Sequence, residues 1–416
     1  MSNEVVMKAT LAQKAARIMN NVTTEQKNEA LLVMADALVA ASAAIIEANK
    51  LDLKRGQEQG TSSSMLDRLA LDEKRIEAIA NGLREIVQLP DPVGELLEQF
   101  ERPNGIHIRK LRVPLGVIGM IYEARPNVTV DATGLCLKTS NCVVLRGGSA
   151  ALESNRQIVA VLRSALENTA LPADAIQLIE NSDRSSVNEM LKLKGLLDVI
   201  IPRGGAALIN NVVENSIVPV IETGAGVCHT YIDKDADVQM ASEIAFNAKV
   251  QRPSVCNAME TLIIHRDFAN LHLEQLMQKM IEAGVELRLP SPYDQQVKGS
   301  KLVTEQDYAT EYNDYILNIA IVDSLDEALV HINRYSTKHS ECIVTNNKAL
   351  AERFIQEIDA AAVYHNVSTR FTDGFEFGYG AEIGISTQKL HARGPMGLPA
   401  LTSTKYQITG NGQIRQ

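Results

Sequence analysis

The stretch GVIGMIYEARPNVTVDATGLCLKTSNCVVLRGG, residues 116–148, decides the fold. It opens with a short apolar run, passes through a helix-like segment and closes on a second apolar run that ends in Arg-Gly-Gly. Short apolar runs that alternate with helical sequence predict a parallel sheet covered by helices. Similar runs extend the series at 176–180, 197–205 and 217–224. We therefore expect an α/β unit over this part of the chain.

A second series of the same kind begins at residue 228. The runs CHTYID at 228–233 and AMETLIIH at 258–265 open it, and further runs follow as far as residue 366. Amphipathic helical patterns at 324–334 and 349–358 separate the later runs. The chain is thus expected to hold two α/β units.

The sequence before residue 116 has a different texture. Apolar residues recur at helical spacing up to Leu89, where Leu-Pro-Asp-Pro breaks the pattern. Two extended stretches follow at 96–101 and 106–113, and the turn-like sequence Arg-Pro-Asn-Gly joins them. This predicts a helical entry followed by a β-hairpin.

The amino-acid composition and net charge exclude some classes of protein and some kinds of partner. The 416 residues are 45% hydrophobic, which is enough to bury a large core. The five cysteines are odd in number and form no C-x-x-C pair, so neither a disulfide framework nor a zinc site is indicated, which favours a reducing compartment. No secretory signal or membrane-spanning run is evident, so a cytoplasmic protein is expected. The formal net charge of −10 argues against nucleic acid as a general partner but is compatible with a small anionic substrate.

Two Arg-Gly-Gly sequences, at 146–148 and 203–205, end strand-like runs just before helical sequence. Backbone N–H groups at such a position can face an anion, so either loop could hold a phosphate. Ser149 stands where the N-cap of the next helix is expected. The same glycines also suit an ordinary tight turn, and the G-x-G-x-x-G dinucleotide fingerprint is absent.

Cys256 lies in the polar, turn-rich stretch QRPSVCNA, residues 251–258. A thiol in such a loop is accessible, and nearby donors or a helix end could activate it as a nucleophile. An ordinary loop cysteine fits the same position. His229 and His391 have suggestive neighbours, but their spacing supports neither a Cys–His hydrolase pair nor a metal site.

Four motifs together resemble the γ-glutamyl phosphate reductases of the aldehyde dehydrogenase superfamily. They are YEARPNVT at 122–129, QRPSVCN at 251–257, STRFTDG at 368–374 and TQKLHARGPMG at 387–397. The resemblance covers essentially the whole chain and implies an aldehyde-dehydrogenase-like α/β fold with three parts. These would be a Rossmann-type NADP-binding domain at 1–95 and 114–225, a catalytic domain at 226–398, and an oligomerisation arm at 96–113 and 399–416.

The resemblance also assigns roles to residues. Cys256 matches the nucleophile, and Asn127 matches the asparagine that holds the oxyanion together with the backbone N–H of the nucleophile. Ser149 falls where NAD-preferring members often carry a carboxylate, so a neutral serine near Arg146 suits the 2′-phosphate of NADP. The implied cofactor-binding positions are Arg146, Gly147, Gly148, Ser149, Arg203, Gly204, Gly205, Glu222 and Glu311. Candidates for the anionic substrate are Arg252, Ser254, Arg370, His391 and Arg393.

The activity implied is the NADPH-dependent reduction of L-glutamyl 5-phosphate to L-glutamate 5-semialdehyde and phosphate, through a thioester on Cys256, in proline biosynthesis. A homo-oligomer and a functional association with glutamate 5-kinase are implied as well. The nearest rival is an aldehyde dehydrogenase that oxidises an aldehyde with water, because Glu222 resembles the glutamate that activates this water. An acyl-phosphate reductase should avoid that hydrolysis, so Glu222 could instead order a loop, bind substrate or move protons. A non-catalytic scaffold and a cofactor-free cysteine hydrolase are the remaining alternatives.

Overall fold

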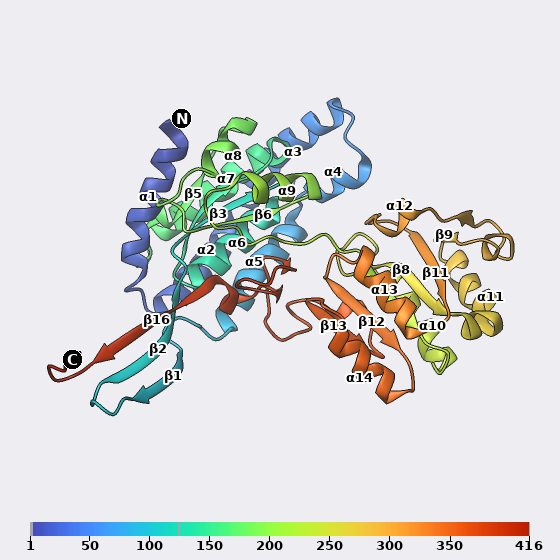
Figure 1. Ribbon diagram of the computed structural model, residues 1–416. Helices are drawn as coiled ribbons and strands as arrows, with labels where there is room; N and C mark the ends of the chain where they lie inside the picture. The colour runs from blue at the N-terminus through green and yellow to red at the C-terminus, as the bar shows by residue number, and fades with distance from the viewer. Residues whose placement is uncertain (1–2, 124, 416) are drawn as a thin grey trace. The chain divides into compact units, whose positions relative to one another are not determined.

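The computed structural model describes residues 3–123 and 125–415 and divides into two compact units (Figure 1). Ala124, in the first motif, and residues 1, 2 and 416, at the ends of the expected domains, lie outside the described residues. The first unit comprises Met1–Thr223, Gly378–Gly384 and Met396–Gln416, and the second comprises Gly224–Phe377 and Ile385–Pro395. This differs from the expected bounds, which place all of 226–398 in one domain.

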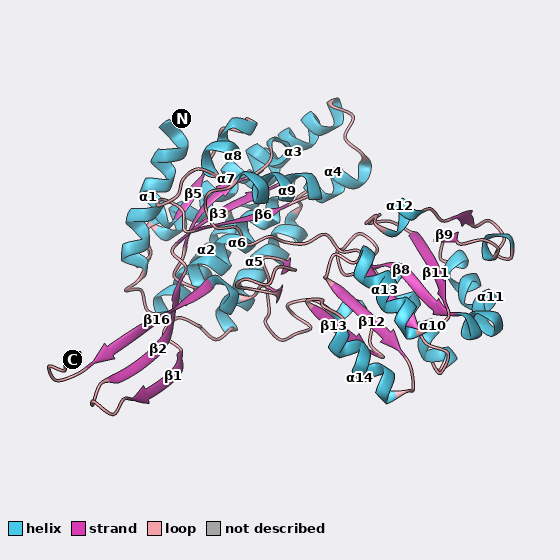
Figure 2. Cartoon of the chain, viewed as in Figure 1, coloured by secondary structure: helices cyan, strands magenta, loops and turns pink. Residues whose placement is uncertain are grey.

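A four-stranded parallel sheet in the order β5-β4-β3-β6 forms the centre of the first unit. Its strands β3 (Val117–Tyr122) and β4 (Cys142–Arg146) are buried along their whole length, which explains their continuous apolar sequence. β5 (Ile176–Leu178) and β6 (Val199–Arg203) flank them. Figure 2 shows helices packed around this sheet; they are α1 (Asn3–Met19), α2 (Thr24–Ala40), α3 (Ser42–Glu58), α4 (Ser63–Leu69), α5 (Glu73–Gln88), α6 (Pro126–Lys138), α7 (Leu152–Leu166), α8 (Arg184–Met190) and α9 (Ala206–Asn215).

Two local expectations in this unit were wrong. The run at 217–224 forms no strand of its own and meets β6 only in an isolated bridge between Ile200 and Val220. Pro219 lies in this run, and proline cannot donate a hydrogen bond to a sheet. Ser149 is not the N-cap either, because a 3₁₀ turn, Ser149–Ala151, begins at Ser149 itself and is preceded by Gly148.

The expected hairpin is present and has a third strand. β1 (Leu96–Glu101) and β2 (His107–Pro114) pair antiparallel, and β16 (Thr402–Thr409), from the C-terminal segment, pairs with the other side of β2. Figure 1 shows these three strands extending together away from the helices of the first unit. Both β1 and β16 are therefore edge strands in this chain.

The second unit is built on a seven-stranded parallel sheet in the order β10-β9-β11-β8-β7-β12-β13. The strands are β7 (Cys228–Ile232), β8 (Met259–His265), β9 (Glu286–Leu289), β10 (Lys301–Leu302), β11 (Ile316–Val322), β12 (Ser340–Val344) and β13 (Ala362–His365). Its helices are α10 (Val238–Val250), α11 (Arg266–Glu282), α12 (Glu305–Tyr308), α13 (Leu325–Tyr335) and α14 (Lys348–Glu357), and a small ribbon is formed by β14 (Ile385–Ser386) and β15 (Gly394–Pro395).

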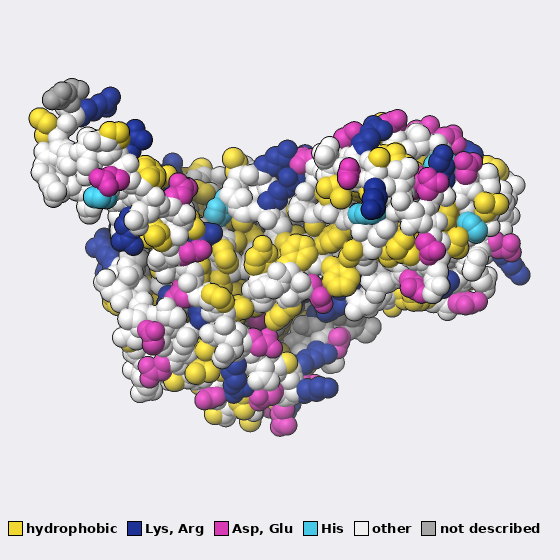
Figure 3. All heavy atoms as spheres, turned by 90° about the horizontal axis from the view of Figure 1, so that it is seen from below, with side chains coloured by type: hydrophobic (Ala, Val, Ile, Leu, Met, Phe, Trp, Pro, Cys, Tyr) yellow, Lys and Arg dark blue, Asp and Glu magenta, His cyan; other side chains and the backbone are white. Residues whose placement is uncertain are grey.

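No single helix within 3–123 and 125–415 is long and apolar enough to cross a membrane; only α2 and α3 taken together, bent by 67° at their junction, have the length and composition for it. On the face drawn in Figure 3, basic and acidic side chains are interspersed rather than gathered into one basic area.

Candidate active site

The first Arg-Gly-Gly loop, at the end of β4, is tightly packed against its own unit. A Cβ on Gly147 would lie 2.3 Å from Nδ2 of Asn155 and 3.1 Å from the ring of Tyr122, so the position requires glycine. Nδ2 of Asn155 is buried and has no hydrogen-bond partner among the described residues. Beyond the glycines, Ser149 is exposed, and the Arg55 guanidinium approaches its carbonyl oxygen at 3.4 Å. Arg55 is therefore a cation at this loop that the sequence did not reveal.

Arg146 is more buried than a ligand-binding side chain is expected to be. Its Nη2 donates to the carbonyl oxygens of Ser182 at 2.6 Å and Asp183 at 3.1 Å, and its Nε donates to Oγ of Ser186 at 3.2 Å. Burial lowers the pKa of this guanidinium. Arg146 thus holds the loop before α8, and among the described residues only its Nη1 is left for a ligand.

The second Arg-Gly-Gly loop meets a carboxylate. The backbone N–H of Gly205, directly before α9, donates to Oε2 of Glu123 at 3.1 Å. A Cβ on Gly204 would lie 2.6 Å from the carboxyl carbon of Glu123. A helix start that attracts a carboxylate has the donors and the dipole that suit a phosphate. The residues present therefore fit the phosphate groups of a dinucleotide cofactor, and Gly204 and Gly205 would be among those that hold it.

Asn127 lies in the first turn of α6, which begins at Pro126 as an N-terminal proline permits. Its Nδ2 donates to Oδ2 of Asp131, one helical turn later, at 3.0 Å. Burial raises the pKa of Asp131 to about 6, against the opposing effects of the Asn127 hydrogen bond and the charge of Arg203. No other hydrogen bond of the Asn127 amide is found within the described residues.

Cys256 lies in the second unit, in the turn that joins α10 to β8, and is partly exposed. Two residues contact its backbone: Gly226, shortly before β7, and Cys228, the first residue of β7. A Cβ on Gly226 would lie only 1.4 Å from the carbonyl oxygen of Cys256, and the thiol of Cys228 donates to the same oxygen at 3.2 Å. Burial keeps the pKa of Cys228 well above its usual range, so this thiol remains a donor.

Arg370 brackets the Cys256 loop from the other side. Its Nε donates to Oε1 of Gln251 at 2.9 Å, before Cys256 in the chain, and its Nη1 donates to Oδ1 of Asn257, directly after Cys256. Burial, and after it the charge of Arg252, lowers the pKa of this guanidinium. The charges of Asp373 and Cys256 act in the opposite direction. Arg252 and Ser254 lie in the same loop as Cys256, and Arg370 bonds residues on both sides of it.

A pocket of about 530 Å³ opens beside this loop within the second unit. Glu243, Asn247 and Gln251 line one wall at intervals of four residues, which places them on one face of α10 and its C-cap. The facing wall comes from the segment that carries Ser368 and Arg370. The lining mixes charged and amide side chains with the apolar Ile244, Val367 and Phe371, and it includes Arg370, which the sequence indicates for substrate binding.

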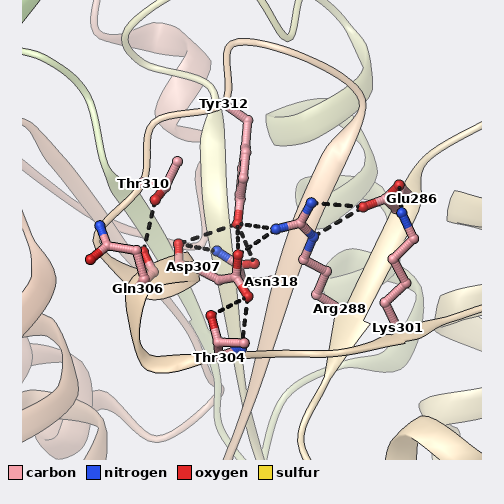
Figure 4. A network of polar contacts seen from close by, with 9 residues as sticks. All are labelled: Glu286, Arg288, Lys301, Thr304, Gln306, Asp307, Thr310, Tyr312 and Asn318. Atoms are coloured by element: carbon pink, nitrogen blue, oxygen red, sulfur yellow. Dashed lines mark hydrogen bonds and ion pairs between the residues drawn. The ribbon is translucent and has the colours of Figure 1, made fainter.

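Glu311 is held by Gly226, the residue that packs against the backbone of Cys256. Its Oε1 accepts a hydrogen bond of 2.7 Å from the backbone N–H of Gly226. The following residue, Tyr312, belongs to a polar network in which its hydroxyl contacts Asp307 at 2.8 Å and Arg288 at 3.0 Å (Figure 4). The guanidinium of Arg288 also lies 4.8 Å from the centre of the Tyr312 ring. This network fixes the segment from which Glu311 extends.

The remaining substrate candidates are Arg393 and His391, and Glu222 is the remaining cofactor candidate. Nη2 of Arg393 forms an ion pair with Asp359 at 2.7 Å, and this carboxylate also pairs with Lys389 at 2.8 Å. Arg393 is therefore engaged within its own unit. His391 adopts a left-handed backbone conformation, with φ of 67°. Glu222 is half-buried at the end of the first unit, and its chain neighbour Thr223 donates to the carbonyl oxygen of Pro202 at 2.9 Å.

No cluster of three or more His, Cys, Asp or Glu side chains suitable for a metal ion is found among residues 3–123 and 125–415. All five cysteines lack disulfide bonds.

Comparison with known proteins identifies the family. The sequence model of the aldehyde dehydrogenase family matches residues 2–316. A γ-glutamyl phosphate reductase of Clostridium novyi is 56% identical over 413 residues, covering 99% of both chains, and one of Moorella thermoacetica is 57% identical with the same coverage. The crystal structure of the Thermotoga maritima γ-glutamyl phosphate reductase superposes with a TM-score of 0.97 at 46% identity, covering both chains completely. An acetylating aldehyde dehydrogenase of Geobacillus thermoglucosidasius, at 15% identity and a TM-score of 0.72, shares the fold.

With the expected α/β fold confirmed and this level of identity along its whole length, the chain belongs to the aldehyde dehydrogenase family and, within it, to the γ-glutamyl phosphate reductases.

Proposed function

We propose that the chain reduces L-glutamyl 5-phosphate to L-glutamate 5-semialdehyde with NADPH, through a thioester on Cys256, as a step of proline biosynthesis. The observation that carries the proposal is the construction of the Cys256 loop. Gly226 and Cys228 hold the backbone of the nucleophile, and Arg370 supplies a cation beside it. The names of the most similar relatives support the substrate.

Acyl transfer comes first. The thiolate of Cys256 attacks the γ-acyl carbon, and Asn127 and the backbone N–H of Cys256 stabilise the oxyanion that forms. The acyl–oxygen bond then breaks and inorganic phosphate leaves with the bonding electrons. Phosphate is a good leaving group, so no strong general acid is required. Arg370 and Arg252 are suited to its charge, because guanidinium groups bind phosphate oxygens in pairs.

Reduction and release follow. The chemistry that a bound nicotinamide cofactor supplies is the transfer of a hydride to the thioester carbon. The resulting thiohemiacetal on Cys256 collapses, returning the thiolate and releasing the semialdehyde. For the amino-acid end of the substrate, the pocket beside Arg370 offers the amides of Asn247 and Gln251.

The glycine loops and the start of α9 support a dinucleotide, and the exposed Ser149 with Arg55 beside it favours the 2′-phosphate of NADP. A carboxylate at Ser149 would repel that phosphate. We further propose that the chain forms homo-oligomers through the open edges of β1 and β16, since edge strands of this length are normally covered.

The test runs the reaction backwards. Purified protein is given glutamate 5-semialdehyde and NADP, with and without inorganic phosphate, and the formation of NADPH is followed by absorbance. Wild type, Cys256→Ser and the control Cys136→Ala, which removes a buried thiol of α6, are compared. We expect NADPH only with phosphate, in wild type and Cys136→Ala but not in Cys256→Ser.

NADPH formation without phosphate would instead show a hydrolytic aldehyde dehydrogenase with Glu222 as its base. Full activity of Cys256→Ser would refute the covalent route.

A further inference from the structure

Asp131 stands out because it costs stability and has no role in the steps above. Its carboxyl is a titratable group in the first unit, and burial disfavours its charged form. Between pH 3.8, the ordinary pKa, and about 6 the folded protein binds a proton at Asp131 more tightly than the unfolded chain does. The carboxyl therefore destabilises the fold as the pH rises through this range. A group that is kept at such a cost invites a functional explanation.

Among residues 3–123 and 125–415, the side-chain partner of this carboxylate is Asn127, the proposed oxyanion donor. Oδ2 of Asp131 accepts from Nδ2 of Asn127 at 3.0 Å. An ionised carboxylate can only accept, so the amide must present its nitrogen to Asp131 rather than its oxygen. The nitrogen carries two hydrogens, and Asp131 takes one. The second remains for a ligand, in a direction that the first bond fixes.

We propose that Asp131 is a positioning residue for the reaction: by accepting one N–H of Asn127, it holds the amide in the orientation that offers the other N–H to the oxyanion of the substrate. This inference rests on the proposed function, because it presupposes the role of Asn127. Without Asp131, the amide can rotate and present its carbonyl oxygen, which would repel the oxyanion.

The groups around Asp131 determine how the orientation of the Asn127 amide responds to pH. The guanidinium of Arg203, at the end of β6, is the charged group whose field acts on the carboxyl, and on α5 Gly82 faces it, since a Cβ on Gly82 would lie 3.9 Å from Oδ1 of Asp131. When Asp131 is protonated it becomes a donor and can bond Oδ1 of Asn127, which turns the amide around. The productive orientation is therefore expected above about pH 6 and lost below it.

The experiment measures kcat and KM of the phosphate-dependent reaction across this pH range for wild type, Asp131→Asn, Asp131→Leu and Asn127→Ala. Asp131→Leu should lose about tenfold or more in kcat with little change in KM, which is less than the about 10²- to 10³-fold expected for loss of the oxyanion donor in Asn127→Ala. Asp131→Asn keeps an acceptor oxygen, so it should retain part of the activity and lose the change near pH 6.

A double variant separates positioning from a structural role. If Asp131 acts through Asn127, then Asp131→Asn should have no further effect on kcat in the Asn127→Ala background. Asp131→Asn should also melt no lower than wild type at neutral pH, since it removes a buried charge. Wild-type kcat in Asp131→Leu, or additive losses in the double variant, would overturn the inference. Failure of the proposed function would show differently, as phosphate-dependent activity that survives in Cys256→Ser.

Discussion

Replacing Gly226 with alanine tests whether the close packing of Gly226 against the backbone of Cys256 is needed for activity. The added Cβ would lie 1.4 Å from the carbonyl oxygen of Cys256, 2.4 Å from its carbonyl carbon and 2.8 Å from its Cα. Ordinary contacts begin at 3.4 Å, so one backbone must retreat by about 2 Å from the other. No side-chain rotation can relieve this clash, because both partners are main chain.

The displacement should reach the chemistry because the proposed oxyanion site includes the N–H of Cys256. A misplacement of about 1 Å at a reacting group can cost about 10²-fold in rate. We therefore expect Gly226→Ala to lower kcat/KM by at least about 10²-fold, which corresponds to about 2.7 kcal/mol of transition-state stabilisation. The hydrogen bond from Gly226 to Glu311 would shift as well.

The assay combines phosphate-dependent NADPH formation with the rate at which iodoacetamide alkylates Cys256, read by mass spectrometry. Ala225→Gly is the matched control, because it alters the neighbouring position without adding an atom, and it should stay near wild type. Circular dichroism and the melting temperature show whether Gly226→Ala is folded. If the folded variant keeps kcat/KM within about twofold of wild type, the described packing is not what positions the nucleophile.

Four further outcomes can be checked in the same preparations. Cys228→Ala should cost about 1 kcal/mol, or about fivefold in kcat/KM, and Cys228→Ser, which keeps a donor, should restore most of it. Ser149→Asp should raise KM for NADPH by about tenfold or more and leave KM for NADH nearly unchanged, measured as initial rates with each cofactor. Lys249→Met, which leaves Glu260 buried without its 2.8 Å partner, should lower the free energy of unfolding in urea by about 3–5 kcal/mol, and adding Glu260→Leu should recover most of the loss. Ile408→Arg, on the exposed edge strand β16, should shift the sedimentation coefficient toward that of a monomer, and an unchanged value would argue against this edge as an interface.

The sequence predicted the two parallel sheets because their strands are buried on both faces. Strands such as β3, β4, β7 and β8 have no exposed residue, and burial of that kind favours the mainly apolar runs from which the sequence predicts them. The sequence does not predict β9, because this strand is only four residues long and alternates between buried and half-buried positions. β10 has two exposed residues and no sequence signal at all.

The candidate site was predictable only in part. Residue type and motif indicated Cys256, Asn127 and Arg370, and the structure places Arg370 at the Cys256 loop. They could not show that Arg146 is engaged by backbone carbonyls or that Arg393 pairs with Asp359, because those partners are distant in sequence. A charged residue does not reveal from its type whether the fold already satisfies it. Asp131 was within reach, since its spacing of four from Asn127 on a predicted helix places the two side chains together.

The contacts around Cys256 explain how this proposed nucleophile can be held rigidly although it lies in a turn. At its base, the ion pair between Lys249 and Glu260 joins the end of α10 to the start of β8, and burial of both side chains makes the pair costly to break. Arg370 donates hydrogen bonds to both Gln251 and Asn257, and Gly226 packs against the backbone of Cys256. Each contact comes from a different part of the second unit. In the proposed mechanism the Cys256 thiolate attacks one carbonyl and then presents the thioester to a hydride donor, and it needs this constancy of position because both steps depend on the same sulfur and the same backbone N–H.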